Sequence, residues 1–282
     1  MTDWTPSPHE LARRELRRSQ QRRAVLQATA VTVVVFAVLT LVIVRSPGWP
    51  RVHETFFSGY HAQHSFDEIL KGFWVNVRLF LICEPCILVL GLAVALARQA
   101  RSAWLTPLRI VAVVYTDVIR GVPTLLLVVL LAFGMPALQL QGIPNSALFW
   151  SGVALVVSYG AYVAEVFRAG IDSVHPSQIN SASALGLSRA QAMRHVVVPQ
   201  AVRRVVPPLL NDFVSLQKDT ALVSAVGVFD AVFSATDYGN FNFNFTPLVV
   251  VAGFFVVCTV PLARLCDWLQ RRWLERERAG AL

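Results

Sequence analysis

Charged residues are scarce in this chain. Only 15% of its 282 residues are charged, whereas 55% are hydrophobic and the mean hydropathy is +0.54. A soluble domain carries nearer a quarter charged residues, so an ordinary soluble globular protein is excluded. The composition predicts an all-α protein that crosses a membrane several times. The net charge of +8 does not indicate nucleic-acid binding, because basic residues beside apolar runs are normally topology signals.

The sequence also lacks the motifs of common enzymes. It contains no Gly-x-x-x-x-Gly-Lys phosphate loop, no Gly-x-Ser-x-Gly elbow and no His-Glu-x-x-His helix. We therefore expect no catalytic residues and no cofactor of its own. His61 and His64 lack further ligands, so no metal site is predicted. The four cysteines lie in or beside apolar runs, where packing is the expected role: Cys83, Cys86, Cys258 and Cys266.

Six apolar runs are long enough to cross the roughly 30 Å hydrocarbon layer as helices. They cover about residues 24–44, 72–97, 108–135, 147–167, 206–229 and 246–268. The first run is followed by Arg45 and not by a small-residue cleavage site, which predicts a retained span and no signal peptide. Residues 45–70 are rich in aromatic side chains and are expected to form a loop, part of it along the membrane surface.

Basic residues are distributed unevenly between the two sides. If the N-terminus is cytoplasmic, the two tails and the segments 98–109 and 168–204 hold 19 Lys and Arg residues, whereas the opposite side holds three. By the positive-inside rule, both termini are predicted to be cytoplasmic. The polar stretch between the fourth and fifth spans then lies in the cytoplasm as well.

Ionisable groups inside a span normally face a cavity or another helix, because exposure to lipid costs free energy. In the fifth span, Asn211, Ser215 and Lys218 are spaced four and three apart and share one helical face. Asp212, Ser215 and Asp219 form an adjoining stripe. Such a helix is expected beside a pathway or at a subunit interface, and the spacing leaves both possibilities open.

The third and fourth spans also contain ionisable residues. Arg120 precedes Pro123 in the third span, and Glu165 lies at the end of the fourth. Pro123 frees a backbone carbonyl, which is tolerated where protein or water can satisfy it. So many buried charges argue against a passive membrane anchor.

The cytoplasmic stretch after the fourth span has the pattern of two short helices joined by glycine. Residues 177–185 suit a short helix, and Gly186 stands where a helix ends in a left-handed residue. Ser188 precedes Gln191 by three residues, the spacing of a capping box that starts a second helix. Pro199 then leads back toward the membrane. This exposed pair suits contact with a partner protein better than contact with lipid.

These residues resemble the coupling region of ABC importer permeases of the polar amino acid uptake family. The matching residues are Ala161-Tyr162, Glu165, Arg168-Ala169-Gly170, Gln178, Ala184-Leu185-Gly186-Leu187-Ser188, Val198-Pro199-Gln200-Ala201, Pro207-Pro208, Asn211 and Lys218-Asp219-Thr220. Arg120-Gly121-Val122-Pro123 resembles the family's Arg-Gly-Thr-Pro, and Phe243-Asn244-Phe245-Thr246-Pro247 and Pro261-Leu262-Ala263-Arg264 resemble its last span. The resemblance covers roughly residues 68–275.

The resemblance implies the type I ABC importer permease fold, with about six transmembrane helices and cytoplasmic coupling helices. It also implies alternating-access uptake of a polar amino acid, driven by two partner ATPase subunits that bind ATP and magnesium. The other expected partners are an extracytoplasmic substrate-binding protein, membrane lipids and a second permease, either an identical copy or a relative. The expected location is the cytoplasmic membrane of a bacterium.

The resemblance and the polar residues within the spans together indicate two sites. The residues expected to contact the ATPase are Ser177, Asn180, Ser181, Ala182, Ala184, Leu185, Gly186, Leu187 and Ser188. The residues hypothesised to line the substrate path are Arg120, Pro123, Glu165, Asn211, Ser215, Lys218 and Asp219. Within that path, Arg120 and Glu165 are the hypothesised contacts for the carboxylate and amine of a zwitterion.

Two departures from the family pattern stand out. The coupling motif usually begins Glu-Ala-Ala, whereas this chain has Asn180-Ser181-Ala182, which predicts a changed partner preference and retained coupling. The first span is additional to the family's five-span core. The expected organisation is a cytoplasmic tail (1–23), the extra helix and an extracytoplasmic loop (24–67), the permease domain (68–275) and a second cytoplasmic tail (276–282).

Two other classes of function are considered. An ion-gradient-driven amino acid carrier would act without an ATPase, but such carriers often show inverted repeats and paired broken helices, and none is evident. If the chain were a membrane scaffold or channel subunit, substitutions at Lys218 and Asp219 would affect assembly only and never flux.

Overall fold

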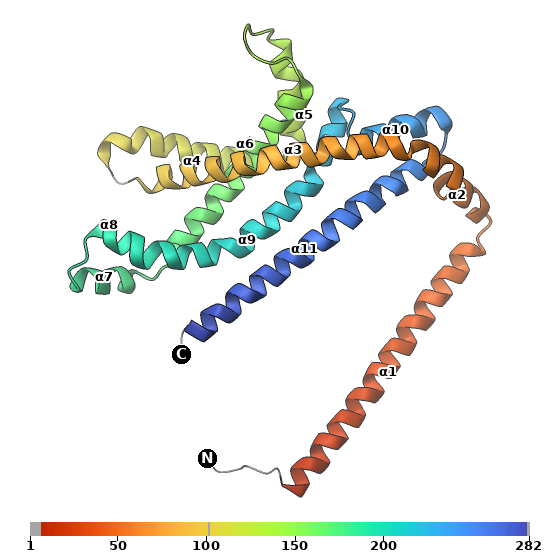
Figure 1. Ribbon diagram of the computed structural model, residues 1–282, viewed down its shortest axis with the longest axis horizontal. Helices are drawn as coiled ribbons and strands as arrows, with labels where there is room; N and C mark the ends of the chain where they lie inside the picture. Colours follow the sequence, from red (N-terminus) through yellow and green to blue (C-terminus); the bar gives the residue numbers. More distant parts are fainter. Residues whose placement is uncertain (1–6, 101, 281–282) are drawn as a thin grey trace. The chain divides into compact units, whose positions relative to one another are not determined.

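The computed structural model describes residues 7–100 and 102–280, and within these ranges every regular element is a helix. The chain divides into two compact units, residues 1–55 and 56–282. The predicted all-α membrane fold is confirmed (Figure 1).

The first unit contains α1 (Pro8–Val44) and nearly all of α2 (Trp49–Phe56). The N-cap of α1 is Ser7, whose hydroxyl accepts a 3.4 Å hydrogen bond from the backbone N–H of Glu10. The predicted span over 24–44 lies within α1, and the helix also includes most of the basic tail, because arginine favours helix. The predicted loop over 45–70 is wrong, since α2 and the beginning of α3 are helical there.

The core of the second unit is built on α3 (Gly59–Gln99) and α6 (Ala147–Asp172), which contain the predicted second and fourth spans. Ile87 of α3 and Leu155 of α6 are almost completely buried in this core. Gly91 allows the two backbones to approach, because a Cβ atom there would lie 2.4 Å from Cγ1 of Val163. Such close contacts through small residues are typical of helices that pack in a membrane.

The predicted third span, 108–135, is broken. A 3₁₀ turn (Ala103–Leu105) leads into α4 (Thr106–Gly121), and α5 (Thr124–Ala137) follows at an angle of 105°. Pro123 is the N-cap of α5, and its ring fixes φ at −56° and removes the N–H that would continue α4. The hydrogen bond that Pro123 was expected to remove thus lies at a sharp bend within the predicted span.

The predicted fifth span, 206–229, begins earlier and is also bent. α9 (Val198–Asp219) leads into a 3₁₀ helix, η3 (Thr220–Val226), which ends at left-handed Gly227 with φ 77°. After this bend of 44° comes α10 (Ala231–Asn242). The predicted sixth span lies within α11 (Thr246–Gly280).

Among the described residues, four helices are long and apolar enough to cross a membrane, and the number rises to six if each bent pair counts as one span. The predicted number of spans is therefore the upper value. Between the fourth and fifth of them lie α7 (Pro176–Ala184), α8 (Arg189–Ala192) and a π-helical turn, η2 (Met193–Val197). Figure 1 shows α7 and α8 together at the N-terminal end of α9.

Candidate functional site

We define the coupling segment as residues 176–197, which comprise α7, α8 and η2. The end of α7 forms a Schellman motif: the N–H of Leu187 donates to the carbonyl of Ala182 (3.1 Å), and that of Gly186 donates to the carbonyl of Ser183 (3.0 Å). Gly186 has φ +80°, as the motif requires. The predicted helix end at Gly186 is confirmed.

The start of α8 is closed by a capping box. The backbone N–H of Gln191 donates to the Ser188 hydroxyl (3.3 Å), and the backbone N–H of Ser188 donates to Oε1 of Gln191 (2.8 Å). The predicted end of α7 at Gly186 and the predicted N-cap of α8 at Ser188 are therefore both present, two residues apart. The turn between α7 and α8 is thus fixed by its own hydrogen bonds.

The coupling segment is also tied to the helices on either side. The helical backbone continues from α8 through η2 into α9, and Pro199 lies in the first turn of α9. The helix therefore does not end at this proline, and the π turn of η2 precedes it instead. Gln200 of α9 donates to Gln178 of α7, and Arg204 of α9 donates to the carbonyl of Ser173 at the end of α6. Hydrogen bonds and continuous helical backbone thus connect the coupling segment to α9 and to the end of α6.

Most of the predicted ATPase-contacting residues are accessible. Exposed side chains or glycine backbone occur at Ser177, Asn180, Ser181, Ala184, Leu185, Gly186 and Ser188. Leu185 is 82% exposed in the turn after α7, whereas Leu187 is partly buried and Ala182, within α7, is buried. Ala182 is therefore not accessible to a partner, whereas the accessible residues of the set include the apolar side chain of Leu185.

Glu165 lies at the centre of a cluster of arginines near the C-terminal end of α6. Its Oε2 accepts hydrogen bonds from Arg98 of α3 (2.8 Å) and from Nε of Arg168 (3.1 Å), and its Oε1 accepts a second bond from Arg168. Arg120 of α4 is 3.7 Å from Oε2. Arg168 also pairs with Asp172. Three guanidinium groups thus meet two carboxylates, which leaves one excess positive charge.

The arginines of this cluster differ in accessibility. The side chain of Arg98 is 13% exposed and also donates to the hydroxyl of Thr116 (2.8 Å), whereas that of Arg120 is 39% exposed. The guanidinium of Arg120 lies 5.7 Å from the ring centroid of Tyr162. Arg120 is therefore the more accessible positive group, and Arg98 anchors the carboxylate from within.

The predicted polar face of α9 is open within one protomer. Asn211 and Lys218 are exposed and Ser215 is partly buried. On the adjoining stripe, the Asp219 carboxylate accepts a 2.7 Å hydrogen bond from Tyr159 of α6, whereas Oδ2 of Asp212 is buried with no hydrogen-bond partner among the described residues. This face is thus available to a pathway or to another subunit.

The structure does not bring the substrate-path residues into one group. Glu165 and Arg120 belong to the arginine cluster, and Pro123 stands at the bend between α4 and α5. Asp219 instead pairs with Tyr159.

A buried polar pair that the sequence reasoning missed joins α3 to the start of α10. Nδ2 of Asn76 donates to Oδ2 of Asp230 (2.9 Å), and Oδ1 of Asn76 accepts from the backbone N–H of Ala231 (3.1 Å). Asn76 is 1% exposed and Asp230 is fully buried. A second missed contact joins α9 to α11, where Thr259 donates to buried Gln217 (2.6 Å). A polar residue in an apolar run was the available signal for both.

Comparison with known proteins agrees with this architecture. Residues 87–275 match the family described as "Binding-protein-dependent transport system inner membrane component". The probable glutamine ABC transporter permease protein GlnM of Bacillus subtilis is 33% identical over 212 residues, which are 74% of this chain and 94% of GlnM. The arginine transport system permease protein ArtQ of the same organism is 30% identical over 185 residues, 66% of this chain and 82% of ArtQ.

Solved structures show the same fold. A crystal structure of an amino acid ABC transporter with histidines aligns with a TM-score of 0.67 at 31% identity, over 73% of this chain and 94% of the other. The inward-facing MetNI methionine ABC transporter aligns with a TM-score of 0.60 at 18% identity, over 73% and 95%, and shares the fold. The chain therefore belongs to the binding-protein-dependent transport system inner membrane component family, whose members are non-catalytic, multi-pass permease subunits of ABC importers that work with separate ATPase and substrate-binding proteins.

Proposed function

We propose that this permease translocates a polar amino acid into a bacterial cell by alternating access, driven by partner ATPase subunits. The substrate class is supported by the relatives, which are named for glutamine and arginine transport. The ion-gradient-driven carrier finds no support among them. Two ATPase subunits and a second permease, identical or related, complete the proposed assembly.

The observation that carries this proposal is the capped turn of the coupling segment. The turn presents Leu185, 82% exposed, between two helix caps that fix its shape. An apolar side chain held out from a rigid polar turn suits insertion into a pocket on a partner protein. We assign this surface to the ATPase, on the cytoplasmic side, where the positive-inside rule also predicts both termini to lie.

The proposed stroke starts at the coupling segment. When the ATPase subunits close, α7 is displaced, and the Gln178–Gln200 and Ser173–Arg204 bonds pass the displacement to α9 and to the end of α6. Because α9 carries the polar face with Asn211 and Lys218, its movement changes which side of the membrane that face is open to.

For the substrate we propose Arg120 as the contact for the amino acid's carboxylate. Its side chain is 39% exposed and lies 3.7 Å from Glu165, whereas Arg168, 34% exposed, pairs closely with both Glu165 and Asp172. Glu165 is less suited to bind the amine directly, since both its oxygens already accept bonds from Arg98 and Arg168. Its proposed role is to hold Arg120 in position. The proposed wall of the path on α9 remains Asn211, Ser215, Lys218 and Asp219. Pro123 sets the bend between α4, which ends just after Arg120, and α5.

The test is co-purification of the ATPase with a Leu185→Asp variant. A carboxylate at this exposed site leaves the permease fold intact but must be desolvated in the partner's pocket, so the yield of bound ATPase is expected to fall at least about tenfold. Leu140→Asp, in the exposed turn between α5 and α6, is the matched control and is expected to retain the ATPase. Equal ATPase recovery with both variants would refute the assigned surface.

A further inference from the structure

Arg78 is a membrane-span residue that the transport mechanism does not use. It lies in α3, inside the predicted second span, and its side chain is exposed. Within the described part of the chain Arg78 has no ion pair, and its guanidinium carbon lies 5.3 Å from the ring centroid of Trp74. An arginine at such a position requires an anionic partner or the headgroup layer, because hydrocarbon does not solvate its charge.

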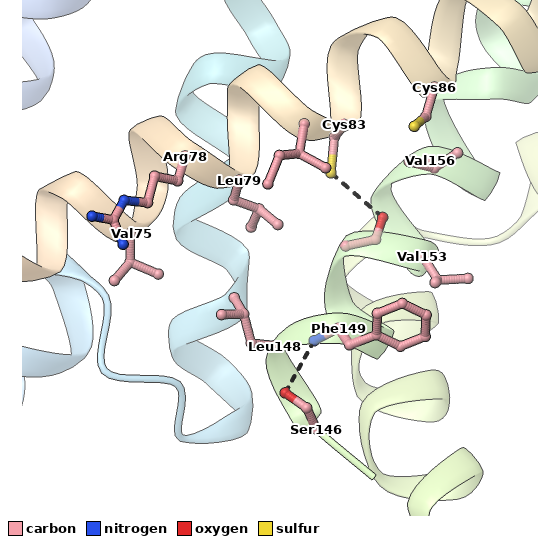
Figure 2. A pocket seen from close by; sticks show the side chains of 12 residues that line it. Val75, Arg78, Leu79, Cys83, Cys86, Ser146, Leu148, Phe149, Val153 and Val156 are labelled. Carbon is pink, nitrogen blue, oxygen red and sulfur yellow. Dashed lines mark hydrogen bonds between the residues drawn. The ribbon is translucent and has the colours of Figure 1, made fainter. Parts of the chain in front are cut away.

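Beside Arg78 an apolar groove runs between α3 and α6 (Figure 2). It encloses about 570 Å³. Aliphatic and aromatic side chains make up most of its wall, including Leu79 and Ile82 from α3 and Phe149, Val153 and Val156 from α6. In Figure 2 Arg78 stands at one end of the groove on α3, and the α6 residues follow the opposite wall. A groove of this kind accepts a hydrocarbon chain.

The groove that Arg78 lines extends to the N-terminal end of α6. Ser146, the N-cap of α6, is part of the lining and marks where that span begins. Next to the groove's Phe149, Trp150 donates a 2.7 Å hydrogen bond to the carbonyl of Pro144. Trp74 lies one turn from Arg78 toward the N-terminus of α3. Tryptophan gathers at the membrane interface, and a long arginine side chain extends toward it.

We propose that this groove binds one anionic phospholipid, with an acyl chain between α3 and α6 and the phosphate group on Arg78. Charge complementarity selects the occupant, because the described residues that line the groove include one cation, Arg78, and no acidic side chain. The chain's own first span, 24–44, contains no charged residue, so it cannot neutralise Arg78. A phospholipid supplies both parts that the groove requires, a phosphate for the guanidinium and a chain for the apolar walls.

The proposal is tested by native mass spectrometry of the delipidated full-length protein, titrated with phosphatidylglycerol and, separately, with phosphatidylcholine of the same acyl chains. The first phosphatidylglycerol is expected to bind more tightly than phosphatidylcholine. Arg78→Gln is expected to weaken its affinity about tenfold, because a charge-assisted hydrogen bond is lost. Arg78→Lys retains the charge and is expected to stay within about threefold of the parent.

Two further variants separate the groove from charge in general. Val153→Trp fills the apolar groove and is expected to reduce phosphatidylglycerol binding as much as Arg78→Gln does. Arg109→Gln removes an exposed arginine outside the groove and is expected to leave the first binding event unchanged. If Arg78→Gln misfolds, the comparison of Val153→Trp with Arg109→Gln decides.

Three results would overturn the proposal. The first is phosphatidylglycerol affinity that neither Arg78→Gln nor Val153→Trp changes. The second is equal affinity for the two lipids in the parent protein. The third is loss of a permease dimer in Arg78→Gln with an unchanged lipid titration, which would make the groove a contact between subunits.

Discussion

Arg98, in the last turn of α3, donates a 2.8 Å hydrogen bond to Oε2 of Glu165, on α6. The bond joins the two helices that form the centre of the permease core, and it is largely enclosed, since the two side chains are 13% and 23% exposed. Arg168 and Arg120 meet the same carboxylate. One acidic side chain therefore links α3, α4 and α6.

Replacing Glu165 with Gln removes the charge that these three arginines share. Uptake is expected to fall at least about tenfold and stability by about 1–3 kcal/mol, because partly enclosed guanidinium groups are left uncompensated. Transport assays and thermal unfolding of the purified variant measure the two effects. Glu10→Gln, which breaks an exposed ion pair with Arg14 on α1, is the control and is expected to cost less than about 1 kcal/mol. Unimpaired uptake by Glu165→Gln would remove this residue from the transport site.

Asn76→Ala is expected to destabilise the protein by about 2–4 kcal/mol. The substitution leaves Oδ2 of Asp230 and the N–H of Ala231 buried without their partner, and each such group costs about 1–3 kcal/mol. Thermal or denaturant unfolding in detergent measures the loss. Asn242→Ala removes an exposed hydrogen bond to the Tyr238 carbonyl on α10 and is expected to be nearly neutral. Equal stability of the two variants would contradict the role given to the buried pair.

Gly186→Ala places a Cβ atom on a residue with φ +80°, a conformation that costs an L-residue roughly 1–2 kcal/mol. The Schellman turn is expected to loosen and ATP-driven uptake to decrease severalfold, while the membrane core stays folded. Gly253→Ala, in α11, meets open space at ordinary helical backbone angles and is the control. If the two variants transport equally well, a rigid turn is not needed for coupling.

The coupling segment is predicted to be cytoplasmic, and cysteine labelling tests this directly. In a background with the four native cysteines replaced, Ala190→Cys is exposed on α8 and is expected to react with a membrane-impermeant maleimide only after the cell is opened. Gln141→Cys, in the exposed turn before α6, is expected to react in intact cells. The reverse pattern would invert the proposed orientation.

Local features were the most predictable from the sequence. The helix end at Gly186 and the capping box of Ser188 and Gln191 depend on residues three to five positions apart, and both were predicted correctly. The 105° bend at Pro123 was not predicted, because a proline signals a lost hydrogen bond but not the direction of the next helix. Asn76 and Asp230 are 154 positions apart, so their pairing depends on tertiary packing that no local pattern reports.

The arginine cluster was predicted only in part. Arg120 and Glu165 were singled out as charges in apolar spans, and the structure places them 3.7 Å apart. Arg98 was counted only as a topology signal, because it follows the second span in a basic segment. Its contact with Glu165 arises from the packing of α3 against α6, which spacing within either helix does not encode.

The most direct test of the central claim is uptake into proteoliposomes that contain this permease and its ATPase, with a loaded amino acid-binding protein outside and ATP inside. The account predicts accumulation that requires ATP hydrolysis and that is lost with Leu185→Asp but retained with Leu140→Asp. Accumulation driven by an ion gradient, in vesicles that hold the permease without any ATPase, would contradict it.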